Sequence, residues 1–168
     1  MAPAGYRDDF LEKGMHMSQV EERINALGLK LPECPVPVAA YVVAKKQGNL
    51  IFVSGQTAQY EGKPMYIGKV GREVSLEEAY ESAKLCALRC ISELNSVADL
   101  DKIQILKVLG FVNAVPEYRD HPKIMNGASE LLEKVFLEKG KHARSAIGVG
   151  SLPDCASVEV ELIASVDE

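Results

Sequence analysis

The sequence predicts an α+β fold in which two helices cover one face of a mixed β-sheet, with the element order β-β-α-β-α-β-β. Three observations support this prediction. Two segments repeat apolar residues every three or four positions, as amphipathic helices do, and runs rich in β-branched residues surround them. The chain has 168 residues, of which 47% are hydrophobic, which is enough to bury one substantial core. A single domain is therefore expected over residues 17–168.

The N-terminal part precedes this domain. Residues 1–16 are polar and lack periodicity, so they are expected to be a disordered extension or a remnant foreign to the native chain. A short helix is expected over 19–27. The segment 31–37 contains three prolines and must be extended, because proline blocks the continuation of a helix.

The first strands and the long helix follow. Strands are expected over 38–44 and 50–54, joined by residues 45–49, because the Gly-Asn step at 48–49 suits a tight reversal. A loop punctuated by glycines covers 56–71. Ser75 and Glu78 have the spacing of a capping box, which predicts a helix that runs to about Ser96. Its apolar face comprises Leu76, Ala79, Ala83, Cys86, Ala87, Cys90, Ile91 and Leu94.

The second half alternates strand and helix. A strand is expected over 102–113, and a helix begins at Asp120-His121-Pro122, because proline is tolerated in a first helical turn. Gly140 ends this helix, and the last two strands, 143–149 and 156–166, are interpreted as a hairpin. The strand over 102–113 carries apolar residues on both faces. Since two helices cover only one face, the other face is expected to pack against another subunit.

Composition excludes several functions. The net charge of -5 argues against binding to nucleic acids or anionic membranes, because both need a basic surface. The four cysteines form no CxxC pair and no histidines have zinc-finger spacing, so no metal is expected; Cys86 and Cys90 are interpreted as core residues. The segment 148–153 lacks the third glycine and the helix of a dinucleotide loop, so no cofactor is expected. No apolar run could span a membrane, which predicts a cytoplasmic protein.

The predicted C-terminal hairpin carries the best candidate for a small-molecule site. Pairing around its loop would place Arg144 opposite Glu161 and Glu159 opposite Ala146, with all the polar groups on one face. A permanently charged guanidinium beside carboxylates and small residues suits a small ligand. The alternative is a surface ion pair between Arg144 and Glu161, which contributes only about 0–1 kcal/mol.

Four segments of the chain stand out by their order. They are Tyr41 with 48–56 (GNLIFVSGQ), Phe111-Val112, Asn126 with Glu130, and Ala143-Arg144-Ser145 through Leu152-Pro153 to Val158-Glu159-Val160-Glu161. The individual motifs are weak, but their order is specific. Together they resemble the YjgF/RidA family of reactive-intermediate deaminases, also described as L-PSP endoribonuclease-like proteins, and the resemblance extends over residues 38–166.

The resemblance implies a chorismate-mutase-like fold, a homotrimer and sites between subunits. It implies that Arg144 binds the carboxylate of a small substrate, that Glu159 positions water, that Gly55 offers backbone hydrogen bonds and that Tyr41 lines the pocket. Asn126 and Glu130 receive only a structural role. The implied reaction is hydrolysis of a 2-imino acid or its enamine tautomer to a 2-keto acid and ammonia, through attack of water on the imine carbon.

Several alternatives stay open. Ala146 stands where active members often have cysteine, which puts the usual substrate range in doubt. A protein that binds small carboxylates without turnover would use the same arginine. Endoribonuclease activity is disfavoured by the acidic charge and by the absence of paired catalytic histidines or an aromatic stacking surface. Tyr41 could instead fill a hairpin core, and Gly55 could simply permit a turn or bulge.

Overall fold

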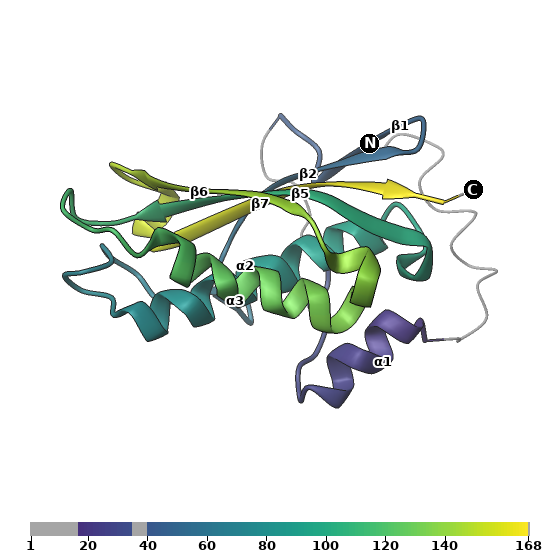
Figure 1. The fold of residues 1–168 in the computed structure, drawn as a ribbon, viewed down its shortest axis with the longest axis horizontal. Coiled ribbons are helices and arrows are strands. Elements are labelled where there is room, and N and C mark those ends of the chain that lie inside the picture. Colours follow the sequence, from purple (N-terminus) through teal and green to yellow (C-terminus); the bar gives the residue numbers. More distant parts are fainter. Residues whose placement is uncertain (1–16, 35–39, 168) are drawn as a thin grey trace.

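The computed structural model describes residues 17–34 and 40–167, and within them it has the predicted α+β architecture. Two long helices lie on one face of a five-stranded sheet (Figure 1). The predicted extension over 1–16 lies outside the described residues. The elements are α1 (Gln19–Ala26), β1 (Ala44–Gln47), β2 (Leu50–Thr57), β3 (Gln59–Tyr60), β4 (Lys63–Pro64), α2 (Leu76–Asn95), β5 (Ile103–Asn113), α3 (His121–Phe136), β6 (Ala143–Val149) and β7 (Val158–Val166).

The first helix is fixed at its N-terminus by two carboxylates. Ser18 and Glu21 form a capping box, and Asp101 accepts hydrogen bonds from the backbone N–H groups of Gln19 and Val20 at 3.0 and 3.2 Å. A carboxylate at this position satisfies free N–H groups and complements the helix dipole. The predicted helix is therefore confirmed, with its end at Ala26.

The first strand differs from the prediction. Residues 40–43 form no strand, and 38–39 lie outside the described residues; β1 begins at Ala44 and includes both lysines that were assigned to the turn. Lysines are compatible with an edge strand because their side chains reach solvent. The reversal contains only Gly48 and Asn49, and Gly48 has φ +60°, a conformation that favours glycine.

The sheet order is β1-β2-β7-β5-β6, so the predicted hairpin between the last two strands is wrong. Strand β5 lies between β6 and β7; it pairs in parallel with β6 and antiparallel with β7. The hairpin does not form because β5, α3 and β6 make a β-α-β unit. The helix carries the chain back across the sheet, so the two strands of such a unit lie parallel. The connection from β6 to β7 instead passes through a 3-10 turn, Pro153–Cys155.

The core lies between the sheet and the two long helices. The predicted capping box of α2 is present, with Glu78 N–H donating to Ser75 Oγ at 3.1 Å and Ser75 N–H to Glu78 Oε2 at 2.8 Å. The thiols of Cys86 and Cys90 are buried and donate to carbonyls of β7 at 3.5 and 3.4 Å, which confirms their interpretation as core residues. Gly110 on β5 lets α3 pack closely, because a Cβ there would overlap the side chain of Met125.

In the described part of the chain, no helix covers the opposite face of the sheet (Figure 1). Leu50, Phe52 and Ile147 are exposed on this open face, and Phe52 retains 44% of its accessible surface. Leu109, Phe111 and Ile163 are half-buried there. The open face therefore exposes large apolar side chains in a single chain, as expected for a surface that packs against another subunit.

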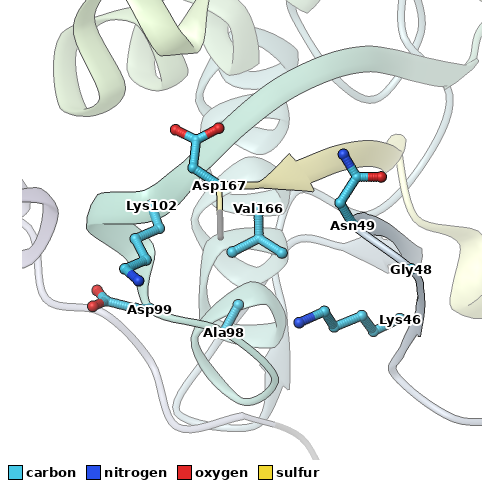
Figure 2. Close-up of a pocket in the computed structure, with 8 residues that line it drawn as sticks. All are labelled: Lys46, Gly48, Asn49, Ala98, Asp99, Lys102, Val166 and Asp167. Carbon is cyan, nitrogen blue, oxygen red and sulfur yellow. The ribbon is translucent and has the colours of Figure 1, made fainter.

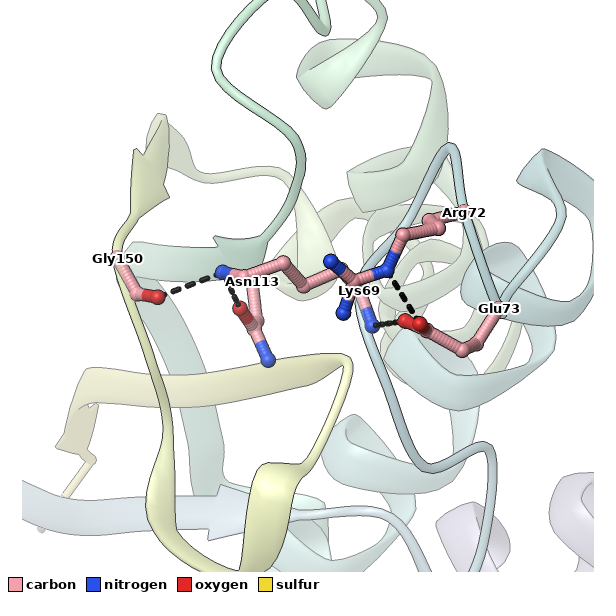
Figure 3. A network of polar contacts seen from close by, with 5 residues as sticks. All are labelled: Lys69, Arg72, Glu73, Asn113 and Gly150. Carbon is pink, nitrogen blue, oxygen red and sulfur yellow. Dashed lines mark hydrogen bonds and ion pairs between the residues drawn. The ribbon is translucent and has the colours of Figure 1, made fainter.

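A polar network ties the loop before α2 to the ends of β5 and β6 (Figure 3). Lys69 Nζ donates to Asn113 Oδ1 at 2.7 Å and to the carbonyl of Gly150 at 2.6 Å. The buried amide of Asn113 in turn donates to the carbonyl of Ala156 at 3.1 Å. This network fixes the β6–β7 connection.

In the described ranges, no helix is long and apolar enough to cross a membrane.

Candidate functional site

Arg144 is held in place by α3. It lies on the edge strand β6 opposite Val108, which is buried beneath the helices, so its side chain points to the helix-covered face. Nη1 donates to Asn126 Oδ1 and to Ser129 Oγ, both at 3.0 Å, and Nη2 donates to the carbonyl of Pro122 at 3.2 Å. A guanidinium has five N–H donors. The Nε–H group and one N–H of Nη2 therefore remain without an acceptor among the described residues.

The charge of Arg144 has no counter-ion in the described part of the chain. Its three acceptors are a side-chain amide, a hydroxyl and a backbone carbonyl, all of them neutral. The ion pair that the hairpin would have formed with Glu161 is absent, because Glu161 lies on β7 opposite Leu109, with β5 in between. An oriented guanidinium with two spare donors matches the two oxygens of a carboxylate.

Glu159 lies on the open face. Its neighbours Val158 and Val160 are buried beneath the helices, and strand residues alternate between faces. Partial burial, and to a smaller degree the nearby charge of Glu161, raise the pKa of Glu159. The carboxylate packs against Gly55, because a Cβ on Gly55 would overlap Oε1. Gly55 lies in the bulge of β2 between Val53 and Gln56.

Tyr41 lies just before β1 and is 50% exposed, which excludes a role as a buried filler of the hairpin in a single chain. The neighbouring backbone runs beside the bulge: Ser54 Oγ donates to the carbonyl of Val42 at 2.8 Å, and Ser54 N–H to that of Val43 at 2.9 Å. The chain around Tyr41 therefore approaches the same bulge that carries Gly55.

A single chain does not bring Arg144 and Glu159 together. The prediction that they share one face of a hairpin is wrong, because Arg144 faces the helices and Glu159 faces the open side. Two strand spacings, about 10 Å, separate β6 from β7. Ala146 lies opposite Gly110 and shares the helix-covered face with Arg144.

Sequence reasoning missed the residues that orient the arginine. Asn126 was given only a structural role, yet it accepts from Arg144, and Ser129 was not singled out. Their spacing of three residues places both on one face of α3, which is the signal that could have found them. Glu130 accepts a hydrogen bond from Tyr80 Oη at 2.8 Å, and this bond raises the pKa of Tyr80 to about 12.

A cavity of about 280 Å³ lies elsewhere, at the end of β7 beside the β1–β2 turn (Figure 2). None of the four predicted site residues lines it. In the described ranges, no group of three or more histidine, cysteine, aspartate or glutamate side chains could hold a metal ion. The cavity is lined by Lys46, Gly48, Asn49, Ala98, Asp99, Lys102, Val166 and Asp167.

The fold and the site together define a chorismate-mutase-like α+β protein with an oriented arginine at the edge of its sheet. A family model described as "YjgF/chorismate_mutase-like, putative endoribonuclease" matches residues 21–166. Because this match covers most of the chain, the protein belongs to the YjgF/RidA family, as its motifs indicate.

Individual relatives agree with this assignment. The chain is 34% identical over 152 residues to Protein TCP17 of Trypanosoma cruzi, covering 89% of this chain and 95% of that one. It is 25% identical over 140 residues to a 2-iminobutanoate/2-iminopropanoate deaminase of Dermatophagoides farinae, covering 83% and 95%. The crystal structure of Atu1372 from Agrobacterium tumefaciens, a protein of unknown function, matches with a TM-score of 0.84 and 40% identity, covering 89% and 93%.

Proposed function

We propose that this protein hydrolyses reactive 2-imino acids, and their enamine tautomers, to 2-keto acids and ammonia. The observation that carries the proposal is the guanidinium of Arg144, which is oriented by three neutral acceptors and keeps two donors for a substrate carboxylate. The relative from Dermatophagoides farinae that is named 2-iminobutanoate/2-iminopropanoate deaminase supports the reaction class.

The reaction needs little catalytic machinery. Water adds to the electrophilic imine carbon, and the resulting carbinolamine loses ammonia as its C–N bond breaks, which leaves the keto acid. Arg144 binds the carboxylate and thereby orients the C=N bond. Glu159, whose pKa is raised by burial, accepts a proton from the attacking water and passes it to the imine nitrogen. It then transfers the hydroxyl proton of the carbinolamine to the same nitrogen, which leaves as ammonia.

This division of roles requires two chains. Arg144 and Glu159 face opposite sides of one sheet, so they contribute to one site only if they come from different subunits. The open face, on which Leu50, Phe52 and Ile147 are exposed, is a surface suited to assembly. We therefore propose a homotrimer with its sites between subunits, which is the assembly that the family resemblance implies.

Ala146 favours a second candidate, a protein that binds small carboxylates without turnover. At this position, two residues after the arginine, the chain offers a methyl group and no thiol. The hydrolysis described above needs no thiol nucleophile, so the deaminase stays the preferred function. Binding of a carboxylate by Arg144 is common to both candidates. Endoribonuclease activity, which the family description names, is disfavoured by the net charge of -5.

Ammonia release from enzymatically generated 2-iminobutanoate tests the proposal. Wild-type protein should accelerate it, and Arg144→Ala should abolish the acceleration while the assembly stays intact. Arg72→Ala is a matched control, because Arg72 is an exposed arginine that pairs with Glu73. Carboxylate binding without acceleration by the wild type would instead support the binding protein. Unchanged turnover in Arg144→Ala would reject Arg144 as the group that binds the substrate carboxylate.

A further inference from the structure

His142 is the residue just before β6, and both of its ring nitrogens make hydrogen bonds. Nδ1 lies 2.6 Å from the carbonyl oxygen of Gly140, and Nε2 lies 2.9 Å from Ser129 Oγ. A carbonyl oxygen can only accept, so Nδ1 carries the proton. In the neutral ring Nε2 is then an acceptor, and the hydroxyl of Ser129 donates to it.

This arrangement directs the lone pairs of Ser129 to Arg144. Because the hydroxyl proton of Ser129 points to His142, its oxygen accepts from Nη1 of Arg144 at 3.0 Å. The donors therefore run in one direction, from Arg144 to Ser129, from Ser129 to His142, and from His142 to the carbonyl of Gly140. Hydrogen bonds in such a chain polarise and strengthen one another.

We propose that His142 and Ser129 are positioning residues, which fix the guanidinium of Arg144 for binding of the substrate carboxylate. The inference rests on the proposed function of Arg144 as the carboxylate-binding group. The chain of hydrogen bonds links the middle of α3, the end of the 3-10 turn Leu137–Gly140 and the start of β6. It therefore holds the arginine from the side opposite its two spare donors.

The guanidinium of Arg144 needs such support because an arginine side chain has many rotamers. Fixing them before the ligand arrives reduces the entropy that binding must offset. Without the Ser129 hydroxyl, Nη1 keeps only Asn126, and the guanidinium can tilt away from the orientation in which Nε and Nη2 face a carboxylate. A lost hydrogen bond to a charged group corresponds to roughly a tenfold loss in affinity.

The experiment compares an anionic probe with a neutral one. Binding of 2-oxobutanoate and of 2-oxobutanamide is measured by calorimetry for Ser129→Ala, Ser129→Thr, His142→Leu and His142→Gln. Ser129→Ala and His142→Leu should bind 2-oxobutanoate roughly tenfold more weakly and the amide unchanged. Ser129→Thr and His142→Gln should recover binding, because they keep a hydroxyl and an acceptor. An equal loss for both probes, or no rescue, would overturn the inference.

Two further measurements separate this inference from the proposed function. Nitrogen-15 chemical shifts of His142 should show the Nδ1–H tautomer, and a predominant Nε2–H tautomer would reject the hydrogen-bond chain. The second measurement is the binding of 2-oxobutanoate by Arg144→Ala, which serves as the reference variant. If it binds 2-oxobutanoate like wild type, the proposed function fails. If it does not bind, yet Ser129→Ala and His142→Leu bind normally, only the positioning role fails.

Discussion

The carboxylate of Glu159 occupies the space next to Gly55 where any other residue would place its Cβ. Such a Cβ would overlap Oε1 and lie 2.9 Å from Cδ of Glu159. The overlap involves the end of a flexible side chain, which can move at small cost. Gly55→Ala should therefore fold with a loss of stability within about 1 kcal/mol, but it should displace the carboxylate and lower kcat for imine hydrolysis. If the substitution disturbed only the backbone of the bulge, stability would fall but kcat would not.

Gly150→Ala is the control for this substitution. A Cβ at Gly150 has no atom within 4 Å, and its backbone has no positive φ. Both variants are compared by urea unfolding and by steady-state ammonia release. Equal kcat in Gly55→Ala and Gly150→Ala would contradict a functional role for the Glu159 carboxylate in its present position.

The second prediction concerns the pH dependence of activity. Burial raises the pKa of Glu159, and the charge of Glu161 raises it further. If ionised Glu159 is the base, activity falls as the pH drops through this raised pKa. Glu161→Gln removes the like charge, so the acid limb of the kcat profile should move to lower pH. Glu159→Gln should abolish that limb together with most of the activity, and an unmoved limb in Glu161→Gln would argue against Glu159 as its source.

The local elements could be predicted from the sequence to a large extent. The capping box at Ser75 and Glu78 and the 3.6-residue periodicity located α2 almost to the residue, and β6 was predicted over its full length. Local hydrogen bonds and burial determine these features, and both leave a direct pattern in the sequence. The predicted position of β1 was wrong because Lys45 and Lys46 are polar, and polarity does not distinguish an edge strand from a turn.

The arrangement of the sheet was not predictable by the same reasoning. A short loop between two strands suggests a hairpin, but the unit of β5, α3 and β6 dictates a parallel pair that separates β6 from β7. This is why Arg144 faces α3 rather than Glu161. The role of His142 was missed because hydrogen bonds between side chains of separate elements follow no sequence period, whereas the spacing of Asn126 and Ser129 was a usable signal for Ser129. Gly55 and Glu159 were singled out through motifs, and the structure places them in contact.

The third prediction concerns stability. Glu93 on α2 is fully buried, neither of its oxygens has a hydrogen-bond partner in the described residues, and burial raises its pKa to about 8. The native state therefore keeps a proton that the unfolded state loses near its ordinary pKa. Stability should fall as the pH rises from the ordinary pKa of a carboxyl group to about 8, and level off above that. The expected fall is about 1.4 kcal/mol for each pH unit.

Glu93→Gln keeps the shape of the side chain and removes this titration. Urea unfolding from about pH 5 to about pH 9 should show a smaller loss of stability in the variant than in the wild type. Glu117→Gln, a substitution of an exposed glutamate, serves as the control and should follow the wild-type curve. Parallel curves for Glu93→Gln and the wild type would show that Glu93 is ionised in the native protein.

The fourth prediction concerns assembly through the open face. Phe52 is 44% exposed and lies opposite Lys45 and Ile163 in the sheet. A charge at this position would be buried in an interface, where an unpaired charge is costly. Phe52→Glu should shift the protein toward monomers in light scattering, with little change in far-ultraviolet circular dichroism. Leu137→Glu, at an exposed position after α3, should leave the assembly unchanged. A wild type that is already monomeric at micromolar concentration would reject the interface.

The last prediction tests whether two chains build each site. Arg144→Ala and Glu159→Gln should each be inactive as pure assemblies, because every site then lacks one of the two groups. In mixed assemblies, however, an Arg144 from the Glu159→Gln chain can meet a Glu159 from the Arg144→Ala chain. Random mixing in a ring of identical interfaces makes one interface in four intact, so refolding the two variants together should restore about a quarter of the wild-type rate.

The control is a mixture of the same variants that has not exchanged subunits. It should stay inactive, because each assembly still contains one variant only. If Arg144 and Glu159 of one chain served the same site, no mixed assembly could contain an intact site, and co-refolding would restore nothing. Recovery thus depends on Arg144 and Glu159 facing opposite sides of one sheet. In the described residues of one chain the two groups face opposite sides, so the proposed site requires a second chain.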